Sequence, residues 1–244
     1  MPLSQNLLLR SLSAEALAKL GPPERVDLPL KTELDEDGHA YFLESGIASI
    51  VASAGGSEPL ELGIIGCEGT SALSVIYRDT ESPFQMYMQV AGTASRFDAS
   101  RLSDLIDERP EVRALMLSFA RAFSIQVSTT AFANGRSKID ARLARWILMA
   151  GDRVGSTFHI THEFLSMMLG VRRSGVTIAM QDLEGRGYIR AQRGTITVRD
   201  RAGLIEATAG AYGFSEAHYE RLLGPRALPF YLPRPPEIQT PVAA

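Results

Sequence analysis

Residues 161–189, THEFLSMMLGVRRSGVTIAMQDLEGRGYI, constrain the fold of this chain more than any other stretch. Their first half predicts a short helix that begins after Thr161, a suitable N-cap, and ends at Gly170, because glycine readily takes the conformation that stops a helix. One face of this helix is apolar and consists of Phe164, Leu165, Met168 and Leu169. The sequence therefore predicts a short helix that packs on a core.

A second helix begins near Arg172 and has two opposite faces. Its apolar stripe, with offsets of zero, three, four and seven, is Val176, Ala179, Met180 and Leu183. Its outward face carries polar side chains four residues apart, Arg173, Thr177 and Gln181. Two short helices that are joined by a glycine-containing turn are typical of a helix-turn-helix.

The residues that follow the second helix predict a β-hairpin. Two strand-like runs, 188–192 and 195–199, meet at Arg193 and Gly194. A hairpin directly after the second helix indicates a winged helix-turn-helix, whose wing would place Arg190 and Arg193 along a phosphate backbone.

The adjacent arginines, Arg172 and Arg173, allow two interpretations. They could be an ordinary solvated helix start, or they could reach the edges of base pairs. Residues 1–137 contain 11 Lys and Arg against 18 Asp and Glu, a net charge of −7, whereas residues 138–224 contain 12 against 9, a net charge of +3. The basic excess lies in the segment that holds the motif, which favours contact with nucleic acid.

The first hundred residues have a different periodicity. After a helix at 14–20, residues 25–98 contain short apolar or alternating runs bounded by turn residues: RVDLPL, HAYFL, IASIVASA, LELGII, MYMQVAG and TASRFD. Their length and spacing predict an antiparallel sandwich or jelly roll.

A long helix is expected at residues 111–134, since this stretch has no proline or internal glycine and follows a short helix at 103–106 that Pro110 terminates. A seam of the coiled-coil type runs along it, with Val112, Met116, Phe119, Phe123, Gln126 and Thr130. This seam could pack on its own domain, but its length and position favour a dimer contact. Asn134 and Gly135 predict a hinge or a helix cap, since both residues tolerate a positive φ, and a further helix is expected at 138–152.

The expected fold class is α+β, with an N-terminal antiparallel β-roll or jelly roll, a long dimerisation helix and a C-terminal winged helix-turn-helix. We predict a β-roll sensor domain at residues 1–108, a dimerisation helix with hinge at 109–137, a DNA-binding domain at 138–224 and a proline-rich tail at 225–244.

The order of these segments, together with RLARWIL and the pattern ITxxxLxxxLGVxRxxVTxxMxxLExxGYI, resembles the Crp/Fnr superfamily of bacterial transcription regulators over about residues 25–200. The resemblance implies that Arg173 reaches guanine, while Thr161, Arg172 and Thr177 contact phosphates or set the register. It also implies double-stranded DNA and a second copy of the chain as partners, with RNA polymerase as a further candidate.

Two positions depart from the family pattern. Ser174 stands where many members have glutamate, and Ile178 stands where many have a second arginine. Both departures remove a base-reading side chain, so the preferred operator should differ. Ile178 could contact a thymine methyl group or could pack under the wing.

Members of this family that bind cyclic AMP hold its ribose with a Gly–Glu loop and its phosphate with an Arg–Ser pair. Gly66 and Glu68 resemble that loop one residue out of step, but ESPFQM occupies the place of the pair. No Lys or Arg lies between Asp79 and Ser95, so only Arg78 could substitute for the missing cation. We therefore expect a small-molecule effector other than cyclic AMP or cyclic GMP.

The remaining residues suggest no catalytic site, metal site or cofactor. Cys67 is the only cysteine, which is too few for an iron–sulfur cluster, and it is expected to be a buried thiol, with redox sensing as the alternative. His39 alone gives little support for haem. His159, His162 and Glu163 do not have metal-ligand spacing.

The alternative to a regulator is a cupin-like protein or enzyme that binds a metal or a small molecule and whose C-terminal helices only pack or bind partners. No apolar run approaches the roughly 18 residues that a membrane span needs. The N-terminus has no signal-peptide core. We therefore expect a cytoplasmic protein that has no membrane partner.

Overall fold

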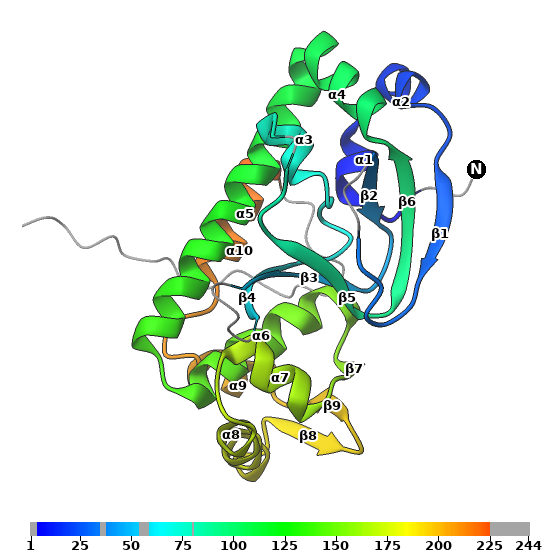
Figure 1. Cartoon of the computed structure of the whole chain (residues 1–244). Coiled ribbons are helices and arrows are strands. Elements are labelled where there is room, and N and C mark those ends of the chain that lie inside the picture. The colour runs from blue at the N-terminus through cyan, green and yellow to red at the C-terminus, as the bar shows by residue number, and fades with distance from the viewer. Residues whose placement is uncertain (1–3, 35–37, 54–58, 80, 225–244) are drawn as a thin grey trace, which may run out of the picture.

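The computed structural model describes residues 4–34, 38–53, 59–79 and 81–224. Its N-terminal half contains the strands β1 (Glu24–Leu28), β2 (His39–Leu43), β3 (Ile47–Ala52), β4 (Leu60–Ile65), β5 (Gln85–Val90) and β6 (Gly92–Asp98). They form two antiparallel sheets, ordered β1-β6-β2 and β4-β3-β5 (Figure 1). The predicted antiparallel β-roll is confirmed.

The first helices of the chain cover one end of this β-roll. They are α1 (Leu7–Ser11), α2 (Ala14–Leu20), α3 (Leu73–Tyr77) and α4 (Ala99–Glu108). The helix expected at 14–20 is α2, which begins where the Ser13 hydroxyl accepts the Ala16 N–H and ends at Gly21, whose φ is +86°.

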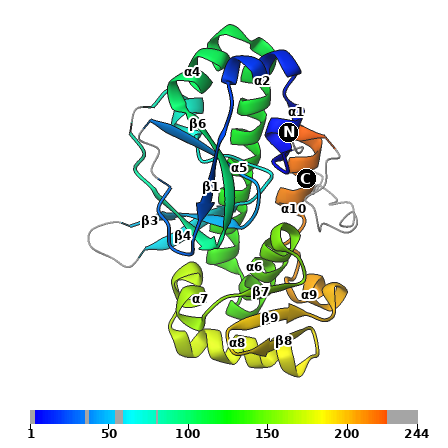
Figure 2. The same cartoon turned by 90° about the vertical axis from the view of Figure 1, so that its right-hand side faces the viewer.

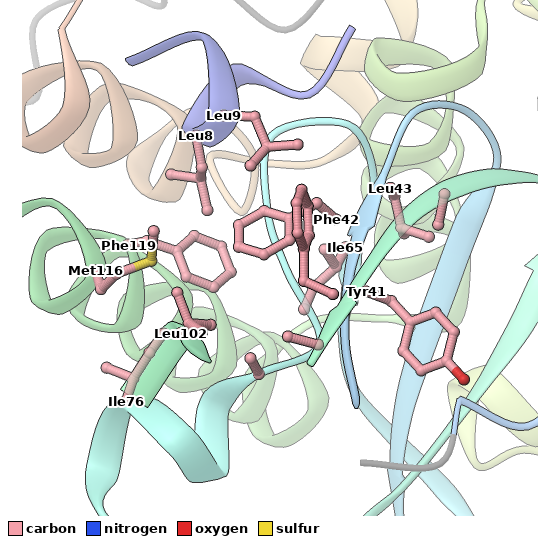
Figure 3. Close-up of a cluster of buried hydrophobic side chains, with 14 of the residues drawn as sticks. Leu8, Leu9, Tyr41, Phe42, Leu43, Ile65, Ile76, Leu102, Met116 and Phe119 are labelled. Atoms are coloured by element: carbon pink, nitrogen blue, oxygen red, sulfur yellow. The ribbon is translucent and has the colours of Figure 1, made fainter. Parts of the chain in front are cut away.

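The core of the N-terminal half joins both sheets to the helices. Phe42 and Phe97 meet edge to face with ring centroids 5.6 Å apart. Figure 3 shows Phe42 beside Leu8 of α1 and Phe119 of the long helix that follows α4. Since Phe42 is fully buried, this contact ties the β-roll to that helix.

The long helix is α5 (Pro110–Arg136), which starts with a proline in its first turn. It continues through Asn134 and Gly135 and ends at Ser137, where φ is −96° and ψ is 150°. Neither residue takes a positive φ and the helical hydrogen bonds extend past both, so the break between α5 and the next helix lies at Ser137 and not at Asn134 and Gly135.

The predicted dimer seam on α5 is also wrong. Val112, Met116 and Phe119 are at most 2% exposed and belong to the core of the β-roll. Further along the seam, the Gln126 side-chain amide binds β4 of the same chain: it accepts a hydrogen bond from the Ile64 N–H at 2.8 Å and donates one to the Ile64 carbonyl at 3.2 Å. The seam packs on its own domain, so a dimer contact would have to use another face of α5.

The C-terminal half begins with α6 (Ile139–Val154) and continues through β7 (Thr157–His159), α7 (His162–Leu169), α8 (Arg173–Gly185), β8 (Ile189–Gln192), β9 (Thr195–Val198), α9 (Arg201–Ala207) and α10 (Phe214–Leu223). A third antiparallel sheet has the order β7-β9-β8. The predicted winged helix-turn-helix fold is confirmed, and β7, α9 and α10 were not predicted.

The last described helix, α10, runs back along α5 to the β-roll, beside α1 (Figure 2). The Tyr219 hydroxyl donates to the Glu68 carbonyl at 2.8 Å, and Leu223 packs against the N-terminal core. A helix of the C-terminal segment thus fastens the two halves together. The proline-rich tail at 225–244 lies outside the described residues.

A helix that could cross a membrane would have to be both long and apolar, and the described part of the chain contains none.

Candidate nucleic-acid interface

The turn between α7 and α8 is built as the sequence predicted. The Thr161 hydroxyl accepts the Phe164 N–H at 3.2 Å and caps α7. Gly170 ends α7 with a φ of +58°, and a Cβ atom there would also lie 2.8 Å from Leu60 Cδ1 of β4. The left-handed conformation therefore favours glycine at this position, whereas the close contact involves only the terminal methyl group of the flexible Leu60 side chain.

Helix α8 presents one face to the core and the other to solvent. The predicted inner stripe, Val176, Ala179, Met180 and Leu183, is at most 5% exposed. Arg173, Ser174 and Gln181 are exposed on the outer side. Burial of the stripe thus fixes which side chains α8 offers to a ligand.

Ile178 is an exception on this outer side, since it is apolar and 67% exposed. Of its two interpretations, packing under the wing is therefore excluded in this structure. An isoleucine that is mostly in water on a polar face is available for contact with another molecule.

Thr177 is less free than its neighbours. Its hydroxyl donates to the Arg173 carbonyl at 3.1 Å and lies 3.2 Å from Nδ1 of His162 at the start of α7. It links the two helices of the motif, so its first role here is to hold α8 against α7.

The wing is a tight turn between β8 and β9. Arg193 and Gly194 have φ values of +51° and +75°, as a two-residue hairpin turn of the primed type requires. A Cβ at position 194 would lie 2.6 Å from Cε1 of the exposed His159 ring, so a larger residue there would displace this ring. This geometry exposes Arg190 and Arg193.

Four exposed arginines, Arg172, Arg173, Arg190 and Arg193, border the motif and the wing. None of the ion pairs found among the described residues involves them, whereas nearby Arg186 pairs with Asp182 at 2.9 Å. Helix α8 and the wing occupy the end of the molecule farthest from α2 and α4 (Figure 1). Their charges therefore remain available to an anionic partner.

The two histidines that suggested a metal site have other neighbours. His159 lies against Gly194, and His162 contacts Thr177. Within the described ranges, no group of three His, Cys, Asp or Glu side chains could hold a metal ion. Among the described residues, neither histidine therefore belongs to a group of the kind that a cupin metal site needs.

The residues expected to form a nucleotide loop serve another purpose. Glu68 forms a buried ion pair with Arg153 of α6, with Oε1 2.9 Å from Nε and 2.7 Å from Nη2, and its other oxygen accepts the Gly66 N–H at 3.0 Å. Arg78 bonds to Ser103 and Asp107 of α4. Gly66 and Glu68 thus contact each other, whereas Arg78 is held by residues of α4, and the binding of a ligand by these three residues stays a prediction.

The motif also contacts the β-roll directly. Tyr87 of β5 and Phe164 of α7 meet with ring centroids 6.0 Å apart, and the Tyr87 hydroxyl lies 3.6 Å from the Met167 sulfur. The β-roll and the first helix of the motif are therefore in direct side-chain contact.

Glu61 is a buried acid at the same boundary, and no motif in the sequence distinguishes it. Its carboxyl group accepts hydrogen bonds from the Ser49 hydroxyl at 2.7 Å and from the Trp146 indole at 3.0 Å. Burial raises the pKa of Glu61 to about 7, although these two bonds and the charge of Arg145 partly favour the ionised form.

The raised pKa of Glu61 predicts a pH-dependent stability. The pKa of Glu61 is about 4.5 without burial and about 7 in the fold, so the folded chain binds this proton more tightly than the unfolded chain does. The resulting stabilisation of the fold is fully present below pH 4.5. This contribution, about 3 kcal/mol, is lost as the pH rises through 7. Glu61→Gln should therefore be more stable than the wild type at pH 8 but not at pH 4.5.

Urea denaturation of the wild type and of Glu61→Gln between pH 4.5 and 8.5 measures this effect. The difference between their free energies of unfolding at each pH gives the contribution of Glu61. Ser49→Ala keeps the acid and should retain the pH dependence. A constant difference between Glu61→Gln and wild type across this range would contradict the assignment.

Residues 141–207 match the family model of the Crp-like helix-turn-helix domain. A search of curated proteins found no match to the chain. The fold is similar to three solved regulators at low identity.

The first is a transcriptional regulator of the Crp/Fnr family from Eubacterium rectale, with 16% identity, a TM-score of 0.65 and coverage of 83% of this chain and 97% of that one. FixK2 from Bradyrhizobium japonicum is 12% identical, with a TM-score of 0.65, and the match covers 76% of this chain and 96% of FixK2. The c-di-GMP-responsive regulator CLP of Xanthomonas campestris is 15% identical, with a TM-score of 0.62, and the match covers 76% of this chain and 99% of CLP.

Proposed function

We propose that this chain, which has the Crp/Fnr-type regulator fold and a Crp-like helix-turn-helix domain, is a dimeric transcription regulator that binds near-palindromic DNA. One observation carries the proposal. The outer face of α8 and the adjacent wing expose four arginines without a carboxylate partner among the described residues. A duplex offers phosphates and acceptor-rich base edges that fit such a surface.

Sequence would be read from the outer face of α8. Arg173 is exposed in the first turn and can donate two hydrogen bonds to O6 and N7 of guanine. Gln181 can pair with adenine, and the exposed Ile178 can contact a thymine methyl group. Ser174 is short, so it would discriminate weakly.

The register on the duplex would be set by phosphate contacts. Thr161 and Arg172 lie at the starts of α7 and α8, where helix N-termini favour anions, and Arg190 and Arg193 lie on the wing. Thr177 would act mainly by holding α8 in position. Such contacts carry affinity without sequence preference.

The dimer contact would use the outer face of α5. An exposed or half-exposed stripe follows three-and-four spacing along the helix: Ala114, Leu117, Arg121, Ser124, Ser128 and Ala131. Leu117 is 48% exposed, and Phe132 next to the stripe is 65% exposed. Small residues allow two helices to approach closely, and the spacing is that of a left-handed coiled coil.

A parallel α5 pair would relate two copies of α8 by a two-fold axis. Two such helices enter successive major grooves about 34 Å apart, and each half-site is then the inverted copy of the other. The proposal therefore requires a near-palindromic operator.

The same proposal divides the chain into a sensor domain at 1–108, a dimerisation helix at 109–137 and a DNA-binding domain at 138–224. It includes a small-molecule effector, RNA polymerase as a further partner and a place in the cytoplasm. The direct contact between Tyr87 and Phe164 supports effector control, because it joins the β-roll to the reading motif.

The reading and positioning roles can be separated by two substitutions. Arg173→Ala should weaken binding to a preferred duplex by roughly 1 to 3 kcal/mol and relax the preference at one base pair of each half-site. Arg193→Ala should weaken binding to every sequence alike and reduce the salt slope by about one. Fluorescence anisotropy on a duplex series with single-base changes measures both effects.

Arg25→Ala is the matched control, because Arg25 is an exposed arginine on β1 of the sensor half. It should leave both the affinity and the salt slope nearly unchanged. Wild-type base preference in Arg173→Ala would contradict the reading role of α8.

A further inference from the structure

A cavity of about 880 Å³ lies between the β-roll and α5. Its floor consists of Leu34, Ile50 and Met86, which are between 3% and 6% exposed. Its volume and its apolar floor are those of sites that enclose a small molecule.

The polar lining of this cavity carries one sign of charge. Glu33, Asp79 and Glu81 contribute carboxyl groups, and the described residues that line the cavity include no Lys, Arg or His. Arg78, the neighbouring cation along the chain, is held by Asp107 and Ser103 instead. These three acidic residues are exposed, so an anion in this cavity would meet like charges and, among the described lining residues, no cation.

Aromatic side chains complete the lining. Tyr77 is 54% exposed and Phe84 is 46% exposed, and both line the cavity with Phe123 of α5. Aromatic faces attract organic ammonium groups, and carboxylates of the same lining add a separate Coulomb attraction for a cation. The two exposed rings would be covered by a ligand with an apolar body.

We propose that this cavity binds a small organic cation, in which an ammonium group is attached to an apolar aromatic or aliphatic body, and that it excludes nucleotide phosphates. The role of this ligand as the effector rests on the proposed function, whereas its charge class rests on the lining alone.

The cavity adjoins the proposed dimer face. Ser124 and Ser128 line the cavity and also belong to the outer stripe of α5. A bound cation would therefore lie close to the second copy of α5. Ligand binding and the geometry of the dimer would be coupled through these two positions.

The test is isothermal titration of the full chain with three probes that share one indole ring system. Tryptamine is a cation at pH 7.4, tryptophol is neutral and indole-3-acetate is an anion, and cyclic AMP is the fourth titrant. We expect tryptamine to bind at least about tenfold more tightly than indole-3-acetate, and cyclic AMP to give no binding heat. The proposal is overturned if tryptamine does not bind, or if indole-3-acetate binds as tightly as tryptamine or more tightly.

A charge-neutral variant tests the lining. Asp79→Asn with Glu81→Gln should remove most of the preference for tryptamine over tryptophol, while Asp104→Asn, an exposed acid on α4 outside the cavity, should keep it. An unchanged preference in the double variant would overturn the role of these carboxylates. No DNA is present, so a failed titration beside intact DNA binding would refute the ligand class and leave the proposed function standing.

Discussion

Replacing Arg153 with methionine should lower the free energy of unfolding by about 3 to 5 kcal/mol. The side chains of Arg153 and Glu68 are each 4% exposed, and two guanidinium nitrogens lie within 2.9 Å of one carboxylate oxygen. Methionine fills much of the same space but leaves the Glu68 carboxyl group buried without its cation. Equilibrium denaturation that is followed by circular dichroism and by the fluorescence of Trp146, the only tryptophan, measures the loss.

Two further variants separate charge burial from packing. Glu68→Gln in the Arg153→Met background should restore at least about 2 kcal/mol, because no charge is then buried. Arg186→Ala removes an exposed pair whose side chains are 47% and 42% exposed, and it should cost less than about 0.5 kcal/mol. A loss below about 1 kcal/mol in Arg153→Met would refute the importance of this contact.

The second large effect concerns the outer face of α5. Leu117→Glu with Ser128→Glu places like charges along both copies of the stripe, so the dimer should dissociate. Each monomer would then hold only one half-site, and the affinity for a palindromic duplex should fall by about 10²- to 10⁴-fold. Sedimentation velocity and fluorescence anisotropy measure the two quantities on the same protein.

The charge-matched control is Ala14→Glu with Ala18→Glu, on an exposed part of α2. It changes the net charge equally and should leave both the dimer and the affinity intact. A stable dimer in the α5 variant would show that the stripe is not the contact between copies.

The direction in which α5 faces illustrates what sequence periodicity can and cannot predict. Spacings of three and four along Met116, Phe119 and Phe123 indicate an apolar face of a helix. They do not reveal whether its partner is a second copy or a sheet of the same chain. Here Phe42 and Ile64 of the β-roll are the partners, and the small residues of the opposite stripe gave only a weak apolar signal.

Single residues correctly predicted the ends of helices and the turn of the hairpin, because these features depend on neighbouring residues in the sequence. The N-cap Thr161, the stop at Gly170 and the turn at Gly194 placed the helices and the wing correctly. By contrast, α10 has no strong apolar period and is held by contacts with α5 and with the Glu68 carbonyl, 151 residues earlier. Tertiary contacts of this kind cannot be read from a local pattern.

The same distinction applies to the candidate site. The helical period correctly assigned Arg173 and Gln181 to the outer face, and the structure then placed Ile178 beside them. The role of Glu68 could not be predicted, because Arg153 lies 85 residues further along the chain. Resemblance to a nucleotide loop suggested a ligand where the fold uses an ion pair.

Selection of binding sites from random duplex DNA by the full chain shows whether a dimer of this chain reads DNA through α8. We expect enrichment of an inverted repeat, with half-sites separated by about one helical turn and with a guanine whose enrichment disappears in Arg173→Ala. If the wild type enriches no sequence, or enriches a single direct site that Arg173→Ala selects equally well, then this chain does not read DNA as a dimer through α8.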